Sequence, residues 1–490
     1  MKINKPFYLK PVIFIVTLSL LFSSFSFRPS KAMAISIEDE EKMGREFLGQ
    51  IRRQCEFLGD DFVNQYFSDL GNYLLIFLET RHFPFHFYII NDRTLNAFAA
   101  PGGNIFFFCG LINIMDGVDE MAAIMSHEIG HVSARHLSDR MEKGKKIGIA
   151  SLAGILAGVF MGGAAAGALI TGSMAAGIQA QLNYSREDER QADQLGFKYM
   201  KESCFDPRGM MITLKKIEHE SMTNPDNVPA YLKTHPTSPE RMSNLDSMLS
   251  SYKPEKPSEE VVRLRTLFPM FQAIVRANSL EPHEAEKVFS VALEKDPDSV
   301  PDNFGLGIFN MGRQDFKQAI NHLNKALAGS PDFVPILTHL GEAYQMGGDD
   351  NKAISLFEKA LKLDNDNKAI PYLLGVSYEN MEQYDRAIGF FERLASLPPV
   401  KDDVYYHLGI SYGRQNRLVS AHYNFGIYFM RMDQLKKAMF HFDKAFELAS
   451  SDPAMREKIR RHRKAIKKGY WKELREEAEK EERERYYGGR

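Results

Sequence analysis

The chain has 490 residues, which is too long for one small domain and long enough for two or three. Its net charge of −2 gives no excess of basic residues, so nucleic acid is excluded as an expected partner. The three cysteines, Cys55, Cys109 and Cys204, form no Cys-x-x-Cys pair, which excludes a thiolate zinc ribbon. At least one thiol is unpaired, and the spacing does not choose a disulfide.

The N-terminus has the pattern of a secretory signal peptide. Three lysines precede an apolar run at 11–27, and Ala32 and Ala34 occupy the small-residue positions of an A-x-A cleavage site. The pattern predicts removal of residues 1–34 and export of the rest, which in a Gram-negative bacterium places the chain in the periplasm. An uncleaved membrane anchor is the alternative.

We expect residues 35–252 to form the first folded domain. Apolar residues at three- and four-residue spacing predict helices over 36–80. The aromatic and branched stretch at 83–92 predicts a strand, and 95–112 predicts two strands around a Pro-Gly-Gly turn. A long helix is predicted from Asp119 to Met141. This mixture is typical of an α+β domain that is mostly helical with a small sheet.

An apolar segment at 147–185 interrupts this domain. No charged residue occurs between Lys146 and Arg186, and glycine and alanine are abundant. We expect a helix and loop that packs on the domain or contacts a membrane surface. A transmembrane hairpin is the alternative, because about 20 apolar residues span a bilayer, although glycine and alanine favour insertion only weakly. Ser185 and Asp188 then form a capping pattern that predicts a new helix.

After a linker at 253–264, residues 265–450 repeat with a period of 34. The repeating glycines, each preceded by leucine, are Gly307, Gly341, Gly375 and Gly409. This period resembles tetratricopeptide repeats, which form an all-α solenoid whose concave groove binds peptide or protein. A last helix pair is 17 residues out of phase, which predicts a half-repeat or distortion near 417–432. The charged tail at 451–490 is predicted to be an exposed helix that caps the solenoid.

The stretch MSHEIGHVSARH at 125–136 carries the main chemical motif. His127 and His131 are four residues apart, so on a helix their Cβ atoms lie about 5–6 Å apart on one face and both rings can reach one metal ion. Glu128 beside them is placed to act as general base in an H-E-x-x-H zinc site. A histidine-rich core helix is the alternative.

A catalytic zinc ion needs a third protein ligand. Leu137 occupies the position at which metzincins carry a third histidine ligand, so that arrangement is absent here. His136 lies off the helix face that His127 and His131 share, so we expect it to support the site without ligating. Acidic residues of a later helix are the remaining source. Spacing alone does not choose Glu189 over Glu187, but Asp193 lies four residues after Glu189 and can hold a ligand histidine through its ring N–H.

These motifs resemble the family of CaaX prenyl proteases and HtpX-type heat-shock proteases, which are gluzincin metalloendopeptidases with the pattern HExxHxxxxH…ExxxD. The resemblance covers about 45–450, including a strand at 96–107 beside the family's active site and an H-P-x-x-x-x-R segment at 235–242. It implies one Zn2+ ion per chain. The implied metal ligands are His127, His131 and Glu189. The implied catalytic glutamate is Glu128, and the implied supporting aspartate is Asp193.

Two further residues follow from the H-P-x-x-x-x-R segment. His235 is expected beside the metal, where it either stabilises the oxyanion during catalysis or ligates zinc as a fourth protein donor and keeps the enzyme latent. A turn histidine before Pro236 is the alternative. Arg241 is expected to pair with a nearby acidic group or to bind a substrate carbonyl, with a plain surface arginine as the alternative.

The sequence therefore predicts an α+β zincin-type metalloprotease domain followed by an all-α tetratricopeptide solenoid. The expected function is an exported zinc metalloendopeptidase that cleaves misfolded or misassembled envelope proteins, including outer-membrane proteins, with Glu128 moving the proton of water to the leaving amine. The repeats would recruit clients, and the substrate would add as a strand near 96–108. The alternatives are an envelope scaffold with a latent zinc site and an integral membrane protease that spans the bilayer at 147–185.

Overall fold

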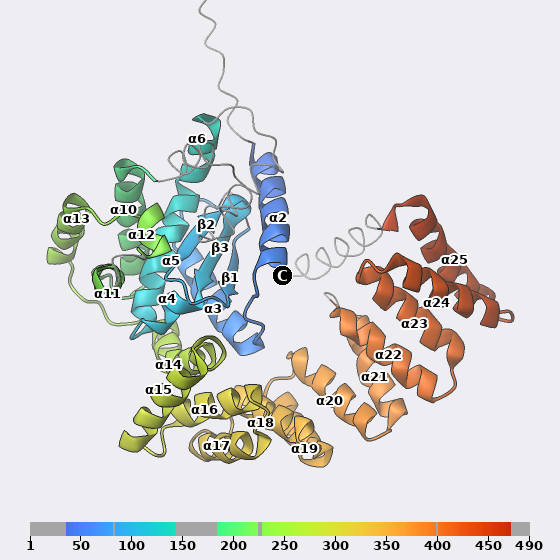
Figure 1. Ribbon diagram of the computed structural model, residues 1–490. Coiled ribbons are helices and arrows are strands. Elements are labelled where there is room, and N and C mark those ends of the chain that lie inside the picture. The colour runs from blue at the N-terminus through green and yellow to red at the C-terminus, as the bar shows by residue number, and fades with distance from the viewer. Residues whose placement is uncertain (1–35, 82–83, 144–183, 224–227, 398–399, 472–490) are drawn as a thin grey trace, which may run out of the picture. The chain divides into compact units, whose positions relative to one another are not determined.

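The computed structural model describes most of the chain (Figure 1). The described ranges are 36–81, 84–143, 184–223, 228–397 and 400–471. The predicted signal peptide, nearly all of the apolar segment at 147–185 and the end of the charged tail lie outside these ranges. Among the described helices, none combines the length and the apolar character needed to cross a bilayer.

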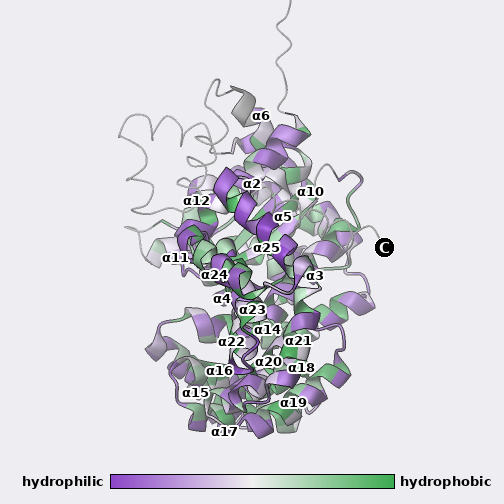
Figure 2. Cartoon of the chain, turned by 90° about the vertical axis from the view of Figure 1, so that its right-hand side faces the viewer, coloured by the Kyte–Doolittle hydropathy of each residue, from purple (hydrophilic) through white to green (hydrophobic). Residues whose placement is uncertain are grey.

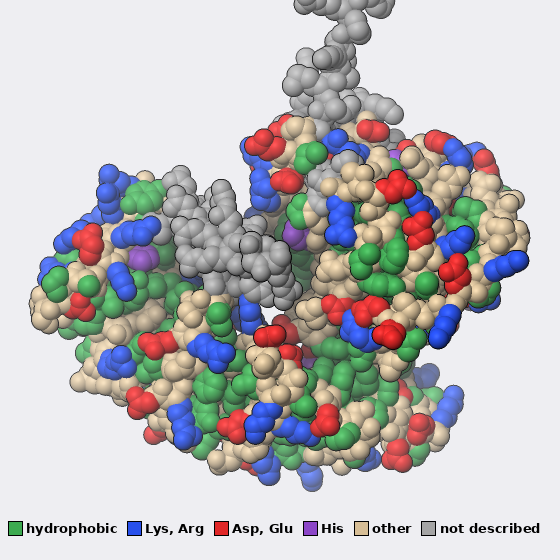
Figure 3. All heavy atoms as spheres, turned by 180° about the vertical axis from the view of Figure 1, so that it is seen from behind, with side chains coloured by type: hydrophobic (Ala, Val, Ile, Leu, Met, Phe, Trp, Pro, Cys, Tyr) green, Lys and Arg blue, Asp and Glu red, His purple; other side chains and the backbone are tan. Residues whose placement is uncertain are grey.

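The chain divides into two compact units. The first comprises Met1–Phe57 and Phe67–Leu264, and the second comprises Leu58–Tyr66 and Arg265–Arg490. Acidic and basic side chains are interspersed over the face drawn in Figure 3, in keeping with the net charge of −2. The predicted linker at 253–264 is already helical from Glu259 onward, because α14 (Glu259–Ser279) begins there.

A three-stranded sheet lies in the first unit. Its strands are β1 (His86–Ile90), β2 (Ala97–Ala100) and β3 (Asn104–Phe108), in the order β1-β3-β2. Strand β1 pairs with β3 in parallel and β2 pairs with β3 in antiparallel. The short helix η1 (Pro101–Gly103) joins β2 to β3, and both of its glycines have positive φ, which suits glycine in a tight turn. The strand pair around a Pro-Gly-Gly turn is confirmed.

The central position of β3 corrects one expectation about the substrate edge. The expected substrate edge near 96–108 includes Phe106 and Phe108, but these residues lie on β3, which is paired on both sides, and both are fully buried. Phe106 instead packs against Phe47 of α2 (Ile37–Gln54), with ring centroids 5.8 Å apart. Within the described sheet, the terminal strand beside the motif helix is therefore β2, whose residues are all buried.

Helices cover both faces of this sheet. Figure 1 shows α2 on one side and α5 (Val118–Ser133) on the other, and α5 contacts β2 and β3. The remaining helices of the first unit are short or amphipathic and surround α5. They are α3 (Asp61–Leu75), which begins in the second unit, α4 (Cys109–Asn113), α6 (His136–Lys143), α10 (Arg186–Glu202), α11 (Arg208–Thr223), α12 (Ala230–Thr234) and α13 (Pro239–Ser250).

The helical stretch predicted from about Asp119 to Met141 is confirmed except for one break at residues 134–135. Helix α5 ends at Ser133, and α6 begins at His136. Between them Arg135 has a φ of 55°, a left-handed conformation that a continuous helix does not contain. The break changes the direction of every later side chain, so the positions of Arg135 and His136 do not follow from helical periodicity.

The second unit is a run of antiparallel helix pairs, as the 34-residue period predicts. Figure 2 shows that these helices carry both apolar and polar residues, as amphipathic helices do. They follow α14 in order along the chain, each packed on the next. They are α15 (Pro282–Lys295), α16 (Val300–Gly312), α17 (Phe316–Gly329), α18 (Val334–Met346), α19 (Asp350–Leu363), α20 (Ala369–Asn380), α21 (Tyr384–Ala395), α22 (Asp402–Arg414), α23 (Leu418–Arg431), α24 (Leu435–Leu448) and α25 (Pro453–Lys468).

The glycines of the repeat leave room for large apolar side chains of the following helix, which are aromatic rings except at Gly307, where the neighbour is Leu323. A Cβ on Gly409 would lie 2.7 Å from the ring of Phe425 on α23. Gly426 on α23 has the same relation to Phe442 of α24, at 2.6 Å. Helix α23 is therefore the second helix of one pair and the first helix of the next. This double use explains the 17-residue change of phase predicted near 417–432.

The start of the charged tail is a helix that closes the solenoid. Trp471, after α25, is 8% exposed and belongs to an apolar cluster with Phe442 and Ile459. Burial of this side chain supports the capping interpretation of the tail for its described part.

A half-buried ion cluster holds residues 58–66 to the repeats within the second unit. On α18, His339 places Nε2 3.0 Å from Asp60 Oδ2 and Nδ1 3.1 Å from Glu342 Oε2. Burial alone would lower the pKa of His339, but its hydrogen bonds and ion pairs with Asp60 and Glu342 outweigh burial and raise the pKa to about 10. The ring of Phe62 packs edge-on against Phe333, with centroids 5.3 Å apart.

Replacing His339 is expected to cost stability in a pH-dependent way. Because the folded pKa lies above the unfolded value of about 6.5, the stabilisation is complete below about pH 6.5 and is lost as the pH rises to about 10. The variant His339→Gln should lower the free energy of unfolding by about 2–3 kcal/mol near pH 6, and by much less near pH 10, in denaturant titrations. The exposed His283→Gln serves as control. An equal loss at both pH values would show that packing, and not charge, is responsible.

Candidate metal centre

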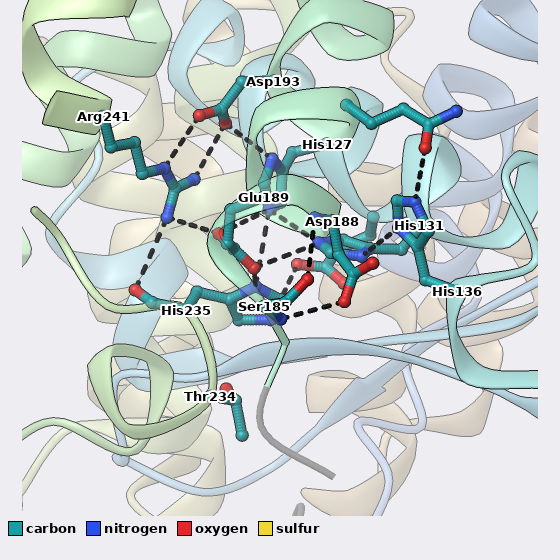
Figure 4. A network of polar contacts seen from close by, with 12 residues as sticks. His127, His131, His136, Ser185, Asp188, Glu189, Asp193, Thr234, His235 and Arg241 are labelled. Carbon is teal, nitrogen blue, oxygen red and sulfur yellow. Dashed lines mark hydrogen bonds and ion pairs between the residues drawn. The ribbon is translucent and has the colours of Figure 1, made fainter. Parts of the chain in front are cut away.

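Helix α5 presents the three residues of the H-E-x-x-H motif to one buried site. His127, Glu128 and His131 are each no more than 1% exposed. As the four-residue spacing requires, the two histidines project from the same face, and their Nε2 atoms lie 3.0 Å apart (Figure 4).

Helix α10 supplies two carboxylates from the opposite side of the site. Glu189 and Asp193 are both buried and lie one helical turn apart. The approach of α10 to α5 is close because Gly196 has no side chain, and a Cβ there would lie 3.2 Å from the backbone nitrogen of His127. Glu187, which spacing left as an alternative, is exposed and pairs with Arg190.

The segment from α12 to α13 adds a third histidine and a buried arginine. His235 ends α12 and is fully buried, and Arg241 on α13 is 6% exposed. The ring of His235 stacks on Tyr231 and on Tyr184, with centroid distances of 4.6 and 5.0 Å. Two aromatic rings thus hold the imidazole plane in the site.

Four side chains converge as the ligands of one metal ion would. Each of His127, His131, Glu189 and His235 offers a donor atom, and all four atoms lie within 4.8 Å of one another. Glu189 is 3.6 Å from His127 Nε2 and 3.5 Å from His131 Nε2, while His235 Nδ1 is 3.4 Å from His127 Nε2. Ligands held at about 2.05 Å around a tetrahedral zinc ion lie about 3.3 Å apart. The spacing and the nitrogen and carboxylate donors therefore fit zinc.

Hydrogen bonds behind the site fix which ring nitrogen faces the metal position. His127 Nδ1 lies 2.9 Å from Asp193 Oδ1, so this nitrogen carries the proton and Nε2 keeps its lone pair. His131 Nδ1 lies 2.9 Å from His136 Nδ1, and His136 Nε2 lies 3.0 Å from Gln191 Oε1. Because Gln191 accepts the proton of His136 Nε2, His136 Nδ1 accepts from His131 Nδ1, and His131 Nε2 is also left free to ligate.

Arg241 compensates the charge of both buried carboxylates. Its Nε and Nη2 lie 2.8 Å from the two oxygens of Asp193, and its Nη1 lies 2.6 Å from Glu189 Oε2. Burial would raise the pKa of Glu189, but the charge of Arg241, followed by that of His235, lowers this pKa well below its usual value. Burial lowers the pKa of His131. At neutral pH Glu189 is therefore ionised and His131 is neutral, which is the state in which both ligate metal.

Glu128, the acidic residue of the H-E-x-x-H motif, has no hydrogen bond to another described residue. Both of its carboxylate oxygens are buried and lack a hydrogen-bond partner among the described residues, as does Nε2 of His235. These two groups face each other, with His235 Nε2 3.6 Å from Glu128 Oε1. A catalytic role or a bound ion or water accounts for buried polar atoms of this kind, and here they adjoin the four candidate metal donors.

The site contains three residues that sequence reasoning missed. Gln191 fixes the tautomer of His136, and Tyr184 and Tyr231 hold the ring of His235. Gln191 lies between Glu189 and Asp193 in the sequence, but no spacing rule marks it, because it acts on a histidine beyond the helix break. The two tyrosines carry no motif at all.

Known proteins match separate parts of the chain. Residues 62–249 match the model of peptidase family M48, and residues 348–407 match a tetratricopeptide repeat model. The beta-barrel assembly-enhancing protease of Yersinia pestis is 32% identical over 230 residues, which are 46% of this chain and 47% of that protein. The mitochondrial metalloendopeptidase OMA1 of Schizosaccharomyces pombe is 28% identical over 189 residues, 38% of this chain and 52% of that protein. The matches span about half the length of these relatives.

The geometry and the matches together define a class of protein. A buried H-E-x-x-H helix joined by a glutamate from a second helix is the metal centre of a zinc metallopeptidase domain. Residues 62–249 match peptidase family M48, and the helix pairs that follow include a match to tetratricopeptide repeats. The metalloprotease resemblance, the fold class and the expectation of zinc are thereby confirmed.

Metal binding should distinguish the two glutamates that spacing could not separate. Glu189→Gln is expected to weaken zinc binding by more than about 100-fold, because it removes a charged donor. This loss of affinity exceeds the one usually seen when a residue that only hydrogen-bonds to a ligand is replaced. Glu187→Gln on the same helix should leave binding unchanged, because its side chain is exposed and paired with Arg190. Zinc content after dialysis and competition with a chelator measure both. Loss of zinc from Glu187→Gln alone would refute this ligand assignment.

Proposed function

We propose that the chain is an exported zinc metalloendopeptidase that cleaves unfolded or misassembled proteins of the cell envelope. The observation that carries this proposal is the convergence of four metal donors beside a buried, unpartnered Glu128 in a domain of peptidase family M48. The ligands proposed for zinc are His127, His131 and Glu189. The signal-peptide pattern supports export to the periplasm.

The chemistry follows from the charges and protons that the residues hold. Zinc, when bound, polarises the scissile carbonyl and makes water more acidic. Glu128 accepts the proton of the attacking water and returns it to the leaving amine, a role that a buried carboxylate without other hydrogen bonds is free to perform. Asp193 and His136 orient the two histidine ligands, and Arg241 holds Glu189 and Asp193 in place.

The position of His235 supports a latent state. A catalytic zinc ion uses three protein ligands and keeps one position open for water or substrate. His235 Nδ1 lies among the other donors, 2.9 Å from Glu189 Oε1 and 3.4 Å from His127 Nε2. In this position His235 would act as a fourth donor to a bound zinc ion. We therefore favour the ligating role of His235 over the oxyanion role.

The substrate is proposed to be an extended, unfolded chain. Strand β2 is an edge of the described sheet and contacts α5, so a peptide could pair with its backbone next to the metal centre. Backbone pairing selects for unfolded segments and places few demands on sequence. The repeats would bind clients or partner proteins, and the relatives named for beta-barrel assembly make outer-membrane proteins the proposed clients. Contact of 147–185 with a membrane surface belongs to the same proposal.

The closed donor set also favours one second candidate. An envelope scaffold could keep the zinc site latent and act through its repeats alone. If a Glu128→Gln chain restored the envelope defect of a deletion strain as fully as the wild type, the scaffold would be the correct function.

Removal of the general base tests the peptidase directly. Glu128→Gln is expected to lower cleavage of an unfolded model protein by about 100- to 10,000-fold, while zinc content stays the same, because Glu128 is not a ligand. Chelation of zinc should abolish cleavage, and restored zinc should return it. Cleavage that survives both treatments would rule out a zinc peptidase.

Removal of His235 tests latency. His235→Ala is expected to raise kcat/KM for an unfolded substrate roughly tenfold, the effect of removing a closed state favoured by about 1.4 kcal/mol. Lys233→Ala, an exposed position on the same short helix, is the control and should have no effect. A fall in kcat/KM with His235→Ala would instead assign this residue to oxyanion stabilisation.

A further inference from the structure

The first helices of successive repeat pairs line one face of the solenoid. Helix α16 contacts α18, α18 contacts α20, and α20 contacts α22 (Figure 1). These contacts are more extensive than those between the second helices of the same pairs, so the first helices lie on the inner side of the curve. In repeat solenoids this concave side is the surface that binds peptides and proteins.

On this face the repeats prearrange a histidine beside two aromatic rings. His339 of α18 has its Nδ1 3.1 Å from Glu342 Oε2 on the same helix, so the N–H of Nε2 points away from Glu342. The ring of Phe304 on α16 lies 5.4 Å from the ring of His339, and the ring of Phe333 lies 6.4 Å from that of Phe304. We call these four residues the His339 site. Residues of the repeats alone hold it in shape.

The start of α3 occupies the His339 site as a ligand would. Asp60 caps α3, because its Oδ1 accepts a hydrogen bond from Val63 N at 2.8 Å, and its Oδ2 lies 3.0 Å from His339 Nε2. Phe62 packs edge-on against Phe333. The side chains of Asp60 and His339 are only 13% and 15% exposed, so water and salt screen their ion pair weakly. The site therefore holds an aspartate that begins a helix and an aromatic ring two residues later.

The occupying segment is short and is not itself part of the repeats. The chain before Leu58 and after Tyr66 belongs to the first unit, while the segment between them belongs to the second. Its remaining ion pair adds little, because Asp61 and Lys401 are exposed and their charged atoms lie 3.8 Å apart. The polar recognition is thus concentrated in one carboxylate, which another protein can also supply together with an aromatic ring.

We propose that the His339 site binds proteins that present an aspartate at the start of a helix with an aromatic residue two positions later, and that residues 58–66 occupy the site until such a partner displaces them. The partner's aspartate would replace Asp60 on His339, and its ring would replace Phe62 on Phe333. A neutral or basic residue in place of the aspartate would leave the half-buried His339 without its second carboxylate. The inference rests on the proposed role of the repeats in binding proteins and does not depend on peptidase activity.

A peptide added in trans tests this site. The probe is a fluorescently labelled peptide with the sequence of residues 58–66, LGDDFVNQY. It is titrated into the full-length chain carrying Glu128→Gln, so that no peptide is cleaved. Asp60→Asn with Phe62→Ala in the chain vacates the site, so this vacated chain should bind the peptide about tenfold more tightly than the chain with native residues 58–66. Fluorescence anisotropy measures both affinities.

Exchange of the aspartate identifies the contact that gives selectivity. A peptide with asparagine in place of Asp60 should bind the vacated chain about tenfold more weakly, because it loses a charged hydrogen bond. With His339→Gln added to the vacated chain, the two peptides should bind equally, because the partner of the carboxylate is gone. His283→Gln, at an exposed position on α15, is the matched control and should preserve the difference.

Circular dichroism shows whether the vacated chain is folded. If it is not, Asp60→Asn alone, which keeps Phe62, takes its place in the same titrations. Equal binding of the two peptides to the folded variant, or no binding up to about 1 mM peptide, would show that residues 58–66 make only a structural contact and would overturn the inference. The expected difference between the peptides would support it even where the wild type cleaves no substrate, in which case the peptidase function alone fails.

Discussion

The metal centre depends on the ion pairs that the buried guanidinium of Arg241 forms with two carboxylates. The guanidinium bonds both oxygens of Asp193 and one oxygen of Glu189, so it joins α13 to α10 at the point where α10 faces α5. Two carboxylates this deeply buried would otherwise be protonated or would separate. With Arg241 in place, Glu189 stays ionised as a ligand and Asp193 stays ionised as the acceptor that orients His127. The two carboxylates carry one negative charge more than Arg241 neutralises, and a bound metal ion would balance it.

The break between α5 and α6 has two consequences for the site. It turns His136 back towards His131, where the chain from Gln191 through His136 fixes the tautomer of the second ligand. It also directs Arg135 to Glu40 of α2, whose Oε2 accepts a hydrogen bond from Arg135 Nη2 at 3.0 Å. A continuous helix would carry both side chains away from these positions. One left-handed residue therefore supports both the metal centre and the ion pair between Arg135 and α2.

The repeat unit shows how far periodicity alone can predict packing. The 34-residue step of glycines predicted helix pairs, and each glycine does make room for a large apolar side chain of the next helix, which is Leu323 at Gly307 and a phenylalanine at Gly341, Gly375 and Gly409. The change of phase near 417–432 was visible in the sequence, but its cause was not. Only the packing shows that α23 uses Phe425 towards one neighbour and Gly426 towards the other, so that the solenoid continues without a gap.

Local periodicity determined the parts of this protein that the sequence could predict by itself. Residues four apart share a helix face wherever the helix lies, so His127 and His131 could be paired from spacing. Tertiary structure decided everything that joins distant segments: that Glu189 is buried while Glu187 is exposed, and that His235 enters the donor set from more than one hundred residues away. These outcomes depend on which helix faces pack together and on where water is excluded. Neither is encoded in the spacing of any single segment.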